Sequence, residues 1–200
     1  MTSIIHKDIH LERKNIYFSR HAEYSSDILG VMNLDCSQKY PLTFQGIQQS
    51  YQLGQKLCTS FIENIFTSEY VRTQQTAYII NDHLDIPAKI FTNPLLNEFN
   101  PGLQFEGKSF KQYLFQNPSI NSPLDPKGEC FLDVFARVQN FLQDLQKNYS
   151  HYNNLIITHG YIIRMIQYML GEISEEQAFK SLDFPKHCCL IQAQFKSHFS

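Results

Sequence analysis

The sequence has almost no net charge. Its 200 residues include 17 lysines and arginines and 19 aspartates and glutamates, which gives a formal net charge of -2. A near-neutral chain gives no reason to expect a nucleic acid or an anionic membrane as a partner. A site for an anion would therefore have to be a local cluster of cations rather than a broad basic surface.

Cysteine is scarce and shows no pattern. The five cysteines are odd in number, and only Cys188 and Cys189 are close together in the chain. No CxxC pair and no cysteine–histidine spacing typical of zinc sites is present, so we expect no disulfide framework, no metal and no cofactor. Reduced thiols are typical of the cytoplasm, where we expect this protein to act.

Long apolar runs and glycine-rich phosphate loops are also missing. The most apolar late stretch, residues 161–170, is interrupted by Arg164 and Gln167 and is too short to span a bilayer. The first 14 residues are polar and lack the apolar core of a signal peptide. Neither a Gly-x-Gly-x-x-Gly motif nor a P-loop occurs, so nothing supports a nucleotide-binding protein.

What the sequence does contain is a regular alternation of short apolar runs and amphipathic segments. The apolar runs predict strands at 15–19, 64–67, 88–92, 154–158 and 189–195. The periodic segments predict helices at about 43–61, 68–83, 110–115, 131–149, 160–170 and 175–180. This order predicts an α/β fold whose mostly parallel central sheet is flanked by helices on both faces, in three layers.

The chain length suits one domain over residues 1–200. Within it, repeated prolines and glycines at about 93–127 predict a small lid or insert. This segment is rich in aromatic residues, which either pack the lid onto the sheet or line an apolar pocket.

Two of the predicted strands lead directly into a histidine. The first leads into Arg20 and His21, and the fourth leads into His159 and Gly160. Because functional groups in α/β sheets collect beyond the carboxyl ends of parallel strands, these residues are expected at one edge. Two imidazoles and a guanidinium at one edge favour a site for a phosphate-like anion. The alternative is that Arg20 forms a surface ion pair and His21 is a structural turn residue.

Two further residues fit a phosphate site. Arg72 is expected in the first turn of the helix after the second strand, where free backbone N–H groups and the helix dipole favour an anion. Glu98 follows the third strand, just before the broken segment. Taken singly, Arg72 could be a surface charge of its helix and Glu98 a solvated loop charge.

Together these segments resemble the histidine phosphatase superfamily, in its phosphoglycerate mutase-like group. The matching blocks occur in the family's order and span roughly residues 15 to 170. They are Phe18 to Glu23, Pro41 to Thr43 with Gly46, Leu53 and Gly54, Thr67 and Ser68 with Arg72 and Gln75 to Ala77, Leu96 to Glu98, Glu106 and Gly107, Gly128 and Glu129, and Thr158 to Gly160 with Ile163 and Arg164.

The resemblance implies a covalent phosphohistidine mechanism with His21 as the nucleophile. It implies that Glu98 protonates the leaving alcohol and later takes a proton from water. The cations that stabilise the transferring phosphoryl group would be Arg20, Arg72 and His159, so no metal is required. The same residues would bind substrate, together with Asn33 and Gly160.

Several positions depart from the family's pattern. Asp27 lies close to where an asparagine is expected near the phosphate, and either Asn33 or Ser25 could replace that asparagine. Tyr24 replaces a small hydroxyl residue. A carboxylate beside a phosphate is repulsive unless it turns away. His187, just before the last predicted strand, is expected to be a surface or structural residue; the alternative is that it approaches the edge where the other groups lie.

The surroundings of the site favour a phosphatase over a mutase. Phe99, Asn100 and Pro101 stand where the glycolytic mutases carry an arginine and a tyrosine for the substrate carboxylate, and residues 108–127 lack paired arginines. We therefore expect metal-independent hydrolysis of a small organic phosphate ester by a monomer or homodimer. The alternatives are a phosphoglycerate-type phosphomutase and a non-catalytic module that binds a phosphorylated ligand.

Overall fold

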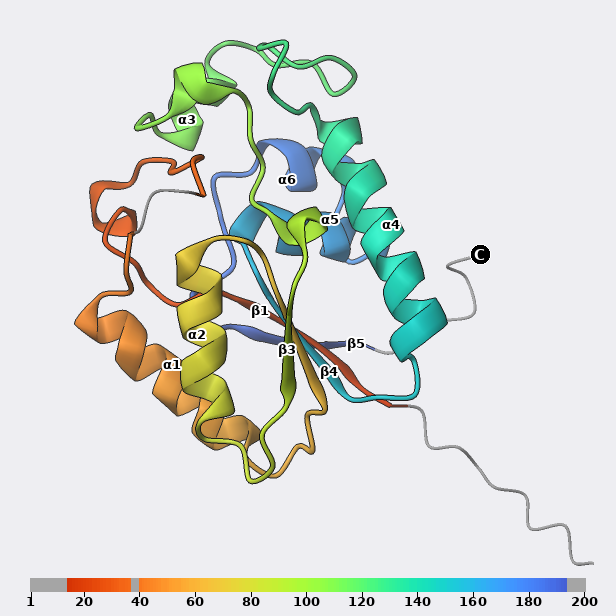
Figure 1. Ribbon diagram of the computed structural model, residues 1–200. Coiled ribbons are helices and arrows are strands. Elements are labelled where there is room, and N and C mark those ends of the chain that lie inside the picture. Colours follow the sequence, from red (N-terminus) through yellow and green to blue (C-terminus); the bar gives the residue numbers. More distant parts are fainter. Residues whose placement is uncertain (1–13, 37–39, 194–200) are drawn as a thin grey trace, which may run out of the picture.

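A five-stranded sheet forms the centre of the computed structural model, which describes residues 14–36 and 40–193 (Figure 1). Its strand order is β3-β2-β4-β1-β5. The parallel strands are β1 (Ile16–Arg20), β2 (Asn64–Thr67), β3 (Lys89–Thr92) and β4 (Asn154–Thr158). Only β5 (Leu190–Ala193) runs antiparallel, beside β1. The predicted mostly parallel sheet is confirmed.

Helices cover both faces of the sheet (Figure 1). They are α1 (Phe44–Leu57), α2 (Val71–Asn81), α3 (Phe110–Leu114), α4 (Phe131–Tyr149), α5 (Gly160–Met169) and α6 (Glu175–Lys180). Three short 3-10 turns that the sequence pattern did not predict lie at η1 (Asp27–Leu29), η2 (Pro94–Leu96) and η3 (Leu103–Phe105). None of the helices in the described ranges has the length and apolar character needed to cross a membrane.

The strands send alternate side chains to two separate cores, as the pleat requires. On β1, Ile16 and Phe18 pack into the core formed with α4 and α5. Tyr17 points the other way, into the core formed with α1 and α2. The three-layer arrangement expected from the sequence is thus confirmed (Figure 1).

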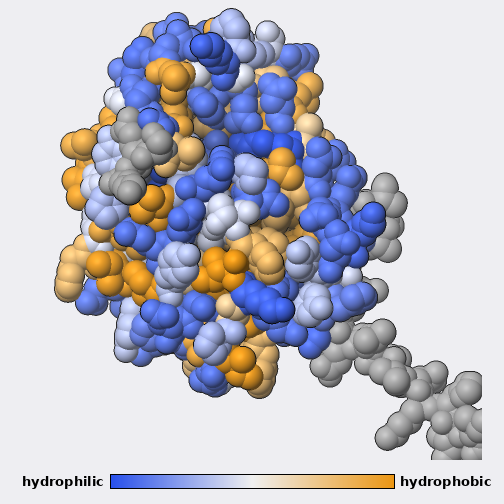
Figure 2. Space-filling model, in the orientation of Figure 1, coloured by the Kyte–Doolittle hydropathy of each residue, from blue (hydrophilic) through white to orange (hydrophobic). Residues whose placement is uncertain are grey.

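Helix α1 begins as predicted but ends earlier than predicted, and some of its apolar side chains are exposed. The Thr43 side chain caps it by accepting from the Gly46 N–H at 3.0 Å. Ile47 and Tyr51 are 46% and 42% exposed, and Phe61, the last residue of the predicted helix, lies beyond the end of α1 and is 65% exposed. Figure 2 shows apolar side chains at the surface on the side of α1.

Helix α1 packs closely on α2 at Gly54. A Cβ on Gly54 would come within 3.2 Å of the Ile80 backbone, so the two helices approach too closely for a bulky side chain there. Leu53 and Leu57 flank this contact and are buried. Ile47 and Tyr51 lie outside this buried contact and stay partly exposed.

The sheet register brings the two histidine-bearing strand ends together. β1 and β4 are parallel neighbours in which Arg20 pairs with Thr158, so the next residue of each strand, His21 and His159, emerges at the same edge. β2 lies on the other side of β4 and leads through Ser68 into α2. This edge is where the candidate site lies.

Candidate active site

His21 is held in one tautomer by its own chain. Its Nδ1 lies 2.8 Å from the Ala22 carbonyl oxygen, which can only accept, so Nδ1 carries the proton. Nε2 of the neutral ring is then left with a lone pair. The side chain is buried, and the backbone N–H of His21 donates to the Thr158 carbonyl at 2.9 Å. A fixed, unprotonated ring nitrogen is what a nucleophilic histidine needs.

His159 lies directly beside this ring. The two ring centroids are 5.2 Å apart. Nε2 of His159 is hydrogen-bonded to Ser68 Oγ at 2.7 Å, and its buried Nδ1 has no partner among the described residues. His159 is therefore oriented from the start of α2 and keeps one nitrogen available for a ligand.

Both histidines are kept neutral by their surroundings. Burial is the largest cause that lowers the pKa of His21 well below its ordinary value, followed by the positive charges of Arg72 and Arg20. The pKa of His159 is lowered in the same way, by burial first and then by Arg72. Neutral imidazoles and permanent guanidinium charges therefore coexist in one site.

Arg72 reaches the site from the first turn of α2. Its Nη1 donates to Asn33 Oδ1 at 2.9 Å, and its guanidinium carbon lies 4.1 Å from the Tyr70 ring centre and 4.5 Å from that of Tyr24. Nε has no partner within the described chain. Sequence reasoning assigned Asn33 to the substrate; in the structure it holds Arg72 and also lines the pocket described below.

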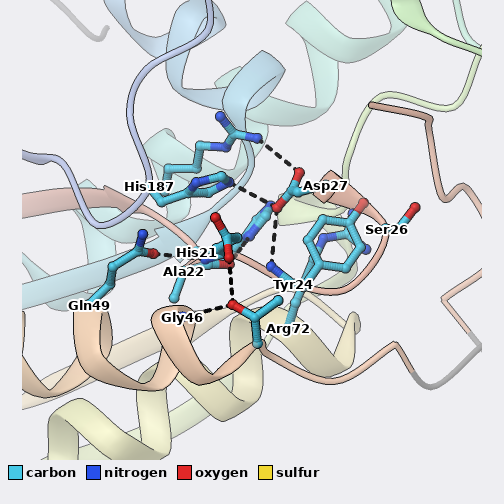
Figure 3. A network of polar contacts seen from close by, with 12 residues as sticks. His21, Ala22, Tyr24, Ser26, Asp27, Gly46, Gln49, Arg72 and His187 are labelled. Carbon is cyan, nitrogen blue, oxygen red and sulfur yellow. Dashed lines mark hydrogen bonds and ion pairs between the residues drawn. The ribbon is translucent and has the colours of Figure 1, made fainter. Parts of the chain in front are cut away.

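Arg20 is oriented by two acceptors at the opposite side. Nη1 donates to the Pro185 carbonyl at 2.9 Å, and Nη2 lies 3.4 Å from Asp27 Oδ1. The other carboxylate oxygen, Asp27 Oδ2, lies 2.9 Å from Nε2 of His187 (Figure 3). Asp27 thus points at a cation and an imidazole, while its Oδ2 also accepts from the Tyr24 N–H at 3.2 Å.

His187 lies beside the site, which the sequence offered only as the alternative to a surface or structural role. Its ring centroid is 5.6 Å from that of His21. The only signal in the sequence was its position shortly before the last predicted strand. Because β5 pairs antiparallel with β1, the segment before β5 is carried back to the edge where β1 ends.

Glu98 lies after η2 at the rim of the same site. Its Oε1 accepts from the Phe99 N–H at 2.9 Å. Burial raises the pKa of this carboxyl above its ordinary value, although Arg72 and Arg20 act in the opposite direction. A carboxyl with a raised pKa is suited to donate a proton and take it back.

Another arginine fixes the turn that carries Glu98. Arg137 on α4 forms an ion pair with Glu129 at 2.6 Å, and its guanidinium donates to the carbonyls of Leu95 at 2.7 Å and Glu98 at 3.3 Å. Arg137 is not among the predicted site residues, because nothing in the sequence distinguishes it from other polar residues of its helix. Its role follows only from the three-dimensional contact between α4 and η2.

A pocket of about 210 Å³ opens over these groups. Four charged or ionisable predicted residues line it, namely Arg20, His21, Arg72 and Glu98. Its other walls are largely apolar or aromatic and include Tyr24, Met32, Leu34, Phe99, Phe110, Tyr161 and Phe184. His159 is fully buried beside His21 and is not part of this lining.

Gly160, which sequence reasoning placed among the substrate-binding residues, begins α5 behind the pocket wall. A Cβ at this position would come 2.8 Å from the Phe184 ring. Its missing side chain makes room for that aromatic residue, and Gly160 itself does not line the pocket.

The chain matches a known family over nearly all of its length. The family model described as histidine phosphatase superfamily (branch 1) matches residues 16–198. A 6-phosphofructo-2-kinase/fructose-2,6-bisphosphatase from Aquarana catesbeiana is 27% identical over 194 residues, covering 92% of this chain; the chain spans only 38% of that relative. "Probable phosphoglycerate mutase GpmB" from Enterobacter sp. (strain 638) is 28% identical, covering 72% of this chain and 69% of that protein.

Solved structures share the fold. Bacillus stearothermophilus YhfR superposes with a TM-score of 0.77 at 22% identity, covering 92% of both chains. The alpha-ribazole phosphatase from Shigella flexneri gives a TM-score of 0.71 at 23% identity, covering 92% of this chain and 91% of that one. At such identities these likenesses establish the architecture.

Proposed function

The chain belongs to the histidine phosphatase superfamily, and we propose that it is a metal-independent phosphomonoesterase that hydrolyses a small organic phosphate through a phosphohistidine at His21. The observation that carries this proposal is the geometry of His21. Its Nδ1–H bond to the Ala22 carbonyl leaves Nε2 free in a pocket that Arg20, Arg72 and Glu98 also line.

In the first half of the proposed reaction, Nε2 of His21 attacks the phosphorus atom. A nitrogen–phosphorus bond forms while the bond from phosphorus to the alcohol oxygen breaks. Glu98 gives its proton to that oxygen, so the leaving group departs as a neutral alcohol. Arg20, Arg72 and His159 stabilise the charge on the phosphoryl oxygens, because donors fixed in a site of low water content cost no reorganisation.

In the second half, water attacks the phosphohistidine. Glu98, now a carboxylate, takes a proton from this water as the new oxygen–phosphorus bond forms. The nitrogen–phosphorus bond breaks and its electron pair returns to His21. Inorganic phosphate leaves, and both His21 and Glu98 regain their starting protonation states.

The pocket walls favour hydrolysis over a mutase reaction. A phosphoglycerate-type mutase must hold the second anionic group of its intermediate while that intermediate reorients in the pocket. Among the described residues that line the pocket, Arg20 and Arg72 are the only cations, and both are needed for the transferring phosphoryl group. The mutase remains the alternative because relatives such as the Enterobacter protein carry that name.

The same walls support a preference for a substrate with an apolar body. Phe99 and Tyr161 stack at 4.6 Å between ring centroids, and Phe110 and Phe184 meet edge to face at 5.4 Å. Aromatic faces stabilise apolar or planar groups by burial and contribute little to binding sugar hydroxyls. We therefore expect aryl or other apolar phosphates to have higher kcat/KM than small sugar phosphates of equal charge.

The test is hydrolysis of an aryl phosphate by purified protein in EDTA. We expect activity in EDTA and a loss of at least about a thousandfold in His21→Ala, because the nucleophile is removed. The exposed His151, on the turn after α4, provides the control variant His151→Ala. Activity that disappears in EDTA, or that survives in His21→Ala, would contradict the proposal.

A brief exposure to substrate, followed by quenching in alkaline denaturant and peptide mapping without acid, separates an enzyme from a binding module. The proposal requires acid-labile phosphate on His21. A protein that binds the phosphate ester but never acquires this label would be the non-catalytic module instead.

A further inference from the structure

We propose that His21, Asp27 and His187 form a binding site for a divalent transition metal of the zinc class, and that the bound metal inhibits the enzyme by occupying Nε2 of His21. One ligand atom from each of the three side chains lies within 4.8 Å of the other two. Two imidazoles and one carboxylate are a common ligand set for such metals. The proposed catalytic reaction uses no metal, so a metal bound at this site would inhibit the reaction and would not take part in it.

The three ligands come from different parts of the chain and converge at one edge of the sheet (Figure 3). His21 follows β1, Asp27 begins η1, and His187 precedes β5. Asp27 Oδ2 and His187 Nε2 are already 2.9 Å apart. Ligand atoms around a tetrahedral zinc ion lie about 3.3 Å apart when each bond is about 2.0–2.1 Å. Small side-chain rotations of the two partly exposed ligands can therefore complete the site.

Two of the ligand side chains are already oriented by hydrogen bonds from their outer sides. Nδ1 of His21 donates to the Ala22 carbonyl, so Nε2 is the nitrogen that is free to bind a metal. Asp27 Oδ1 faces Arg20, which leaves Oδ2 as its metal-binding oxygen. Such outer contacts fix the tautomer and the orientation of a ligand and are typical of metal sites.

The ligand set selects one class of metal. Imidazole nitrogens suit zinc, cobalt, nickel and copper, whereas magnesium and calcium prefer oxygen ligands. The positive charges of Arg20 and Arg72 repel a bound metal cation. We therefore expect this site to bind a metal more weakly than a closed structural zinc site does.

Metal binding and phosphoryl transfer require the same lone pair. Nε2 of His21 cannot attack phosphorus while it is bonded to a metal. Occupancy of the site should therefore block phosphohistidine formation without unfolding the protein, and a chelator should reverse the inhibition. EDTA would then preserve or raise the activity of the enzyme, in contrast to its effect on a metal-dependent phosphatase.

The experiment uses Co²⁺ as a spectroscopic probe on the full chain. Metal-free protein is titrated with Co²⁺, and the visible d–d absorption that distinguishes a tetrahedral or five-coordinate ion from aqueous Co²⁺ is recorded. Zn²⁺ is then added to displace the cobalt and bleach the signal. We expect one equivalent of Co²⁺ to produce the signal and Zn²⁺ to remove it.

Two variants test the assignment of the ligands. His187→Gln and Asp27→Asn each remove one proposed ligand, and each should weaken Co²⁺ binding about tenfold or more. His151→Gln removes an exposed histidine at the turn after α4 and should bind Co²⁺ like the unmodified protein. Circular dichroism and thermal unfolding show whether each variant is folded before its titration is interpreted.

The Co²⁺ titration does not depend on the proposed catalytic function. Absence of the signal, or a signal of undiminished affinity in His187→Gln, would overturn the metal site even if the protein is an active phosphatase. If the protein hydrolyses phosphate esters, Zn²⁺ should inhibit it, and the inhibition constant should rise in His187→Gln in parallel with the Co²⁺ affinity. Equal Zn²⁺ inhibition in both proteins would also overturn the proposal.

Discussion

At the residue scale, the charge states of His21 and Glu98 determine which pH range suits the proposed reaction. His21 must be neutral to attack, and its pKa is lowered by burial and by two arginines. Glu98 must be protonated to release the alcohol, and its pKa is raised by burial. The two shifts act in the same direction on catalysis, because both extend the range in which neutral histidine and protonated glutamic acid coexist.

We therefore predict activity that persists into mildly acidic solution. As pH falls, kcat/KM should decline only below the ordinary histidine pKa of 6.5, since His21 protonates later than a free imidazole. As pH rises, it should decline only above the ordinary glutamate pKa of 4.5, since Glu98 loses its proton later. The measurement is kcat/KM against pH on one aryl phosphate.

Glu98→Gln is the matched variant, because glutamine has nearly the same shape and no titrating proton. Its residual rate should lack the alkaline decline that Glu98 causes, while any decline due to the ionisation of the substrate itself should appear in both proteins. An acid decline of the unmodified enzyme centred at or above pH 6.5 would contradict the charge state assigned to His21.

At the scale of elements, the turn that carries Glu98 depends on a helix that does not touch the substrate pocket. Arg137 on α4 binds the Glu129 carboxylate and the carbonyls of Leu95 and Glu98 at once. The Thr158 hydroxyl donates to the Leu96 carbonyl at 2.8 Å and ties the same turn to β4. Arg137 is therefore a positioning residue for the proposed proton donor.

For Arg137→Met we predict a lower kcat with a smaller change in KM. The phosphate-binding cations are untouched, whereas Glu98 loses the support of its turn. The free energy of unfolding should fall by about 1–3 kcal/mol, because partly buried acceptors are left without a donor. Steady-state kinetics and urea unfolding measure the two effects.

Arg137→Lys separates positioning from a general loss of charge. Lysine keeps the positive charge toward Glu129 but cannot reach several acceptors with one planar group. It should restore much of the stability and only part of kcat. A full recovery of kcat in the lysine variant would show that the hydrogen bonds from the guanidinium group to the carbonyls of Leu95 and Glu98 do not contribute to kcat.

The elements also show where sequence patterns succeed and where they fail. The helix predicted at 131–149 was placed well, because the apolar residues Val134, Val138 and Leu145 recur at helical spacing and face a large apolar core. The helix predicted at about 43–61 was placed less well, since α1 ends at Leu57 and apolar residues such as Ile47 are exposed. Apolar periodicity identifies a helix but does not reveal how closely its neighbour approaches.

At the scale of the whole molecule, the strand-end rule explains how much of the site could be predicted. His21 and His159 are 138 positions apart, yet parallel pairing of β1 with β4 places them together. Asp27 and His187 could not be placed in this way, because their meeting depends on η1 and on the antiparallel return of β5. Residues 1–13 and residues 194–195 of the last predicted strand lie outside the described residues. The single-domain arrangement stays a prediction.

Because the anion-binding groups come from separate segments of the chain, ligand binding should stabilise the entire fold. Arg20 ends β1, Arg72 begins α2 and His159 follows β4. An anion that bridges them binds only the folded state, so inorganic phosphate at about 100 times its Kd should add about 2.7 kcal/mol. For a chain of this size we predict a rise in Tm of about 5–10 °C.

Arg72→Met removes one of these groups while keeping most of the side-chain volume, and should abolish most of the rise in Tm. Lys56→Met, on the exposed last turn of α1, removes a positive charge away from the pocket and should leave the rise intact. Chloride at equal ionic strength controls for screening, which acts on all surface charges alike. The shift in Tm reports binding alone, so we expect the same shift whether the protein is an enzyme or a non-catalytic binding module. An equal rise in Arg72→Met would therefore contradict the anion site itself rather than the chemistry proposed for it.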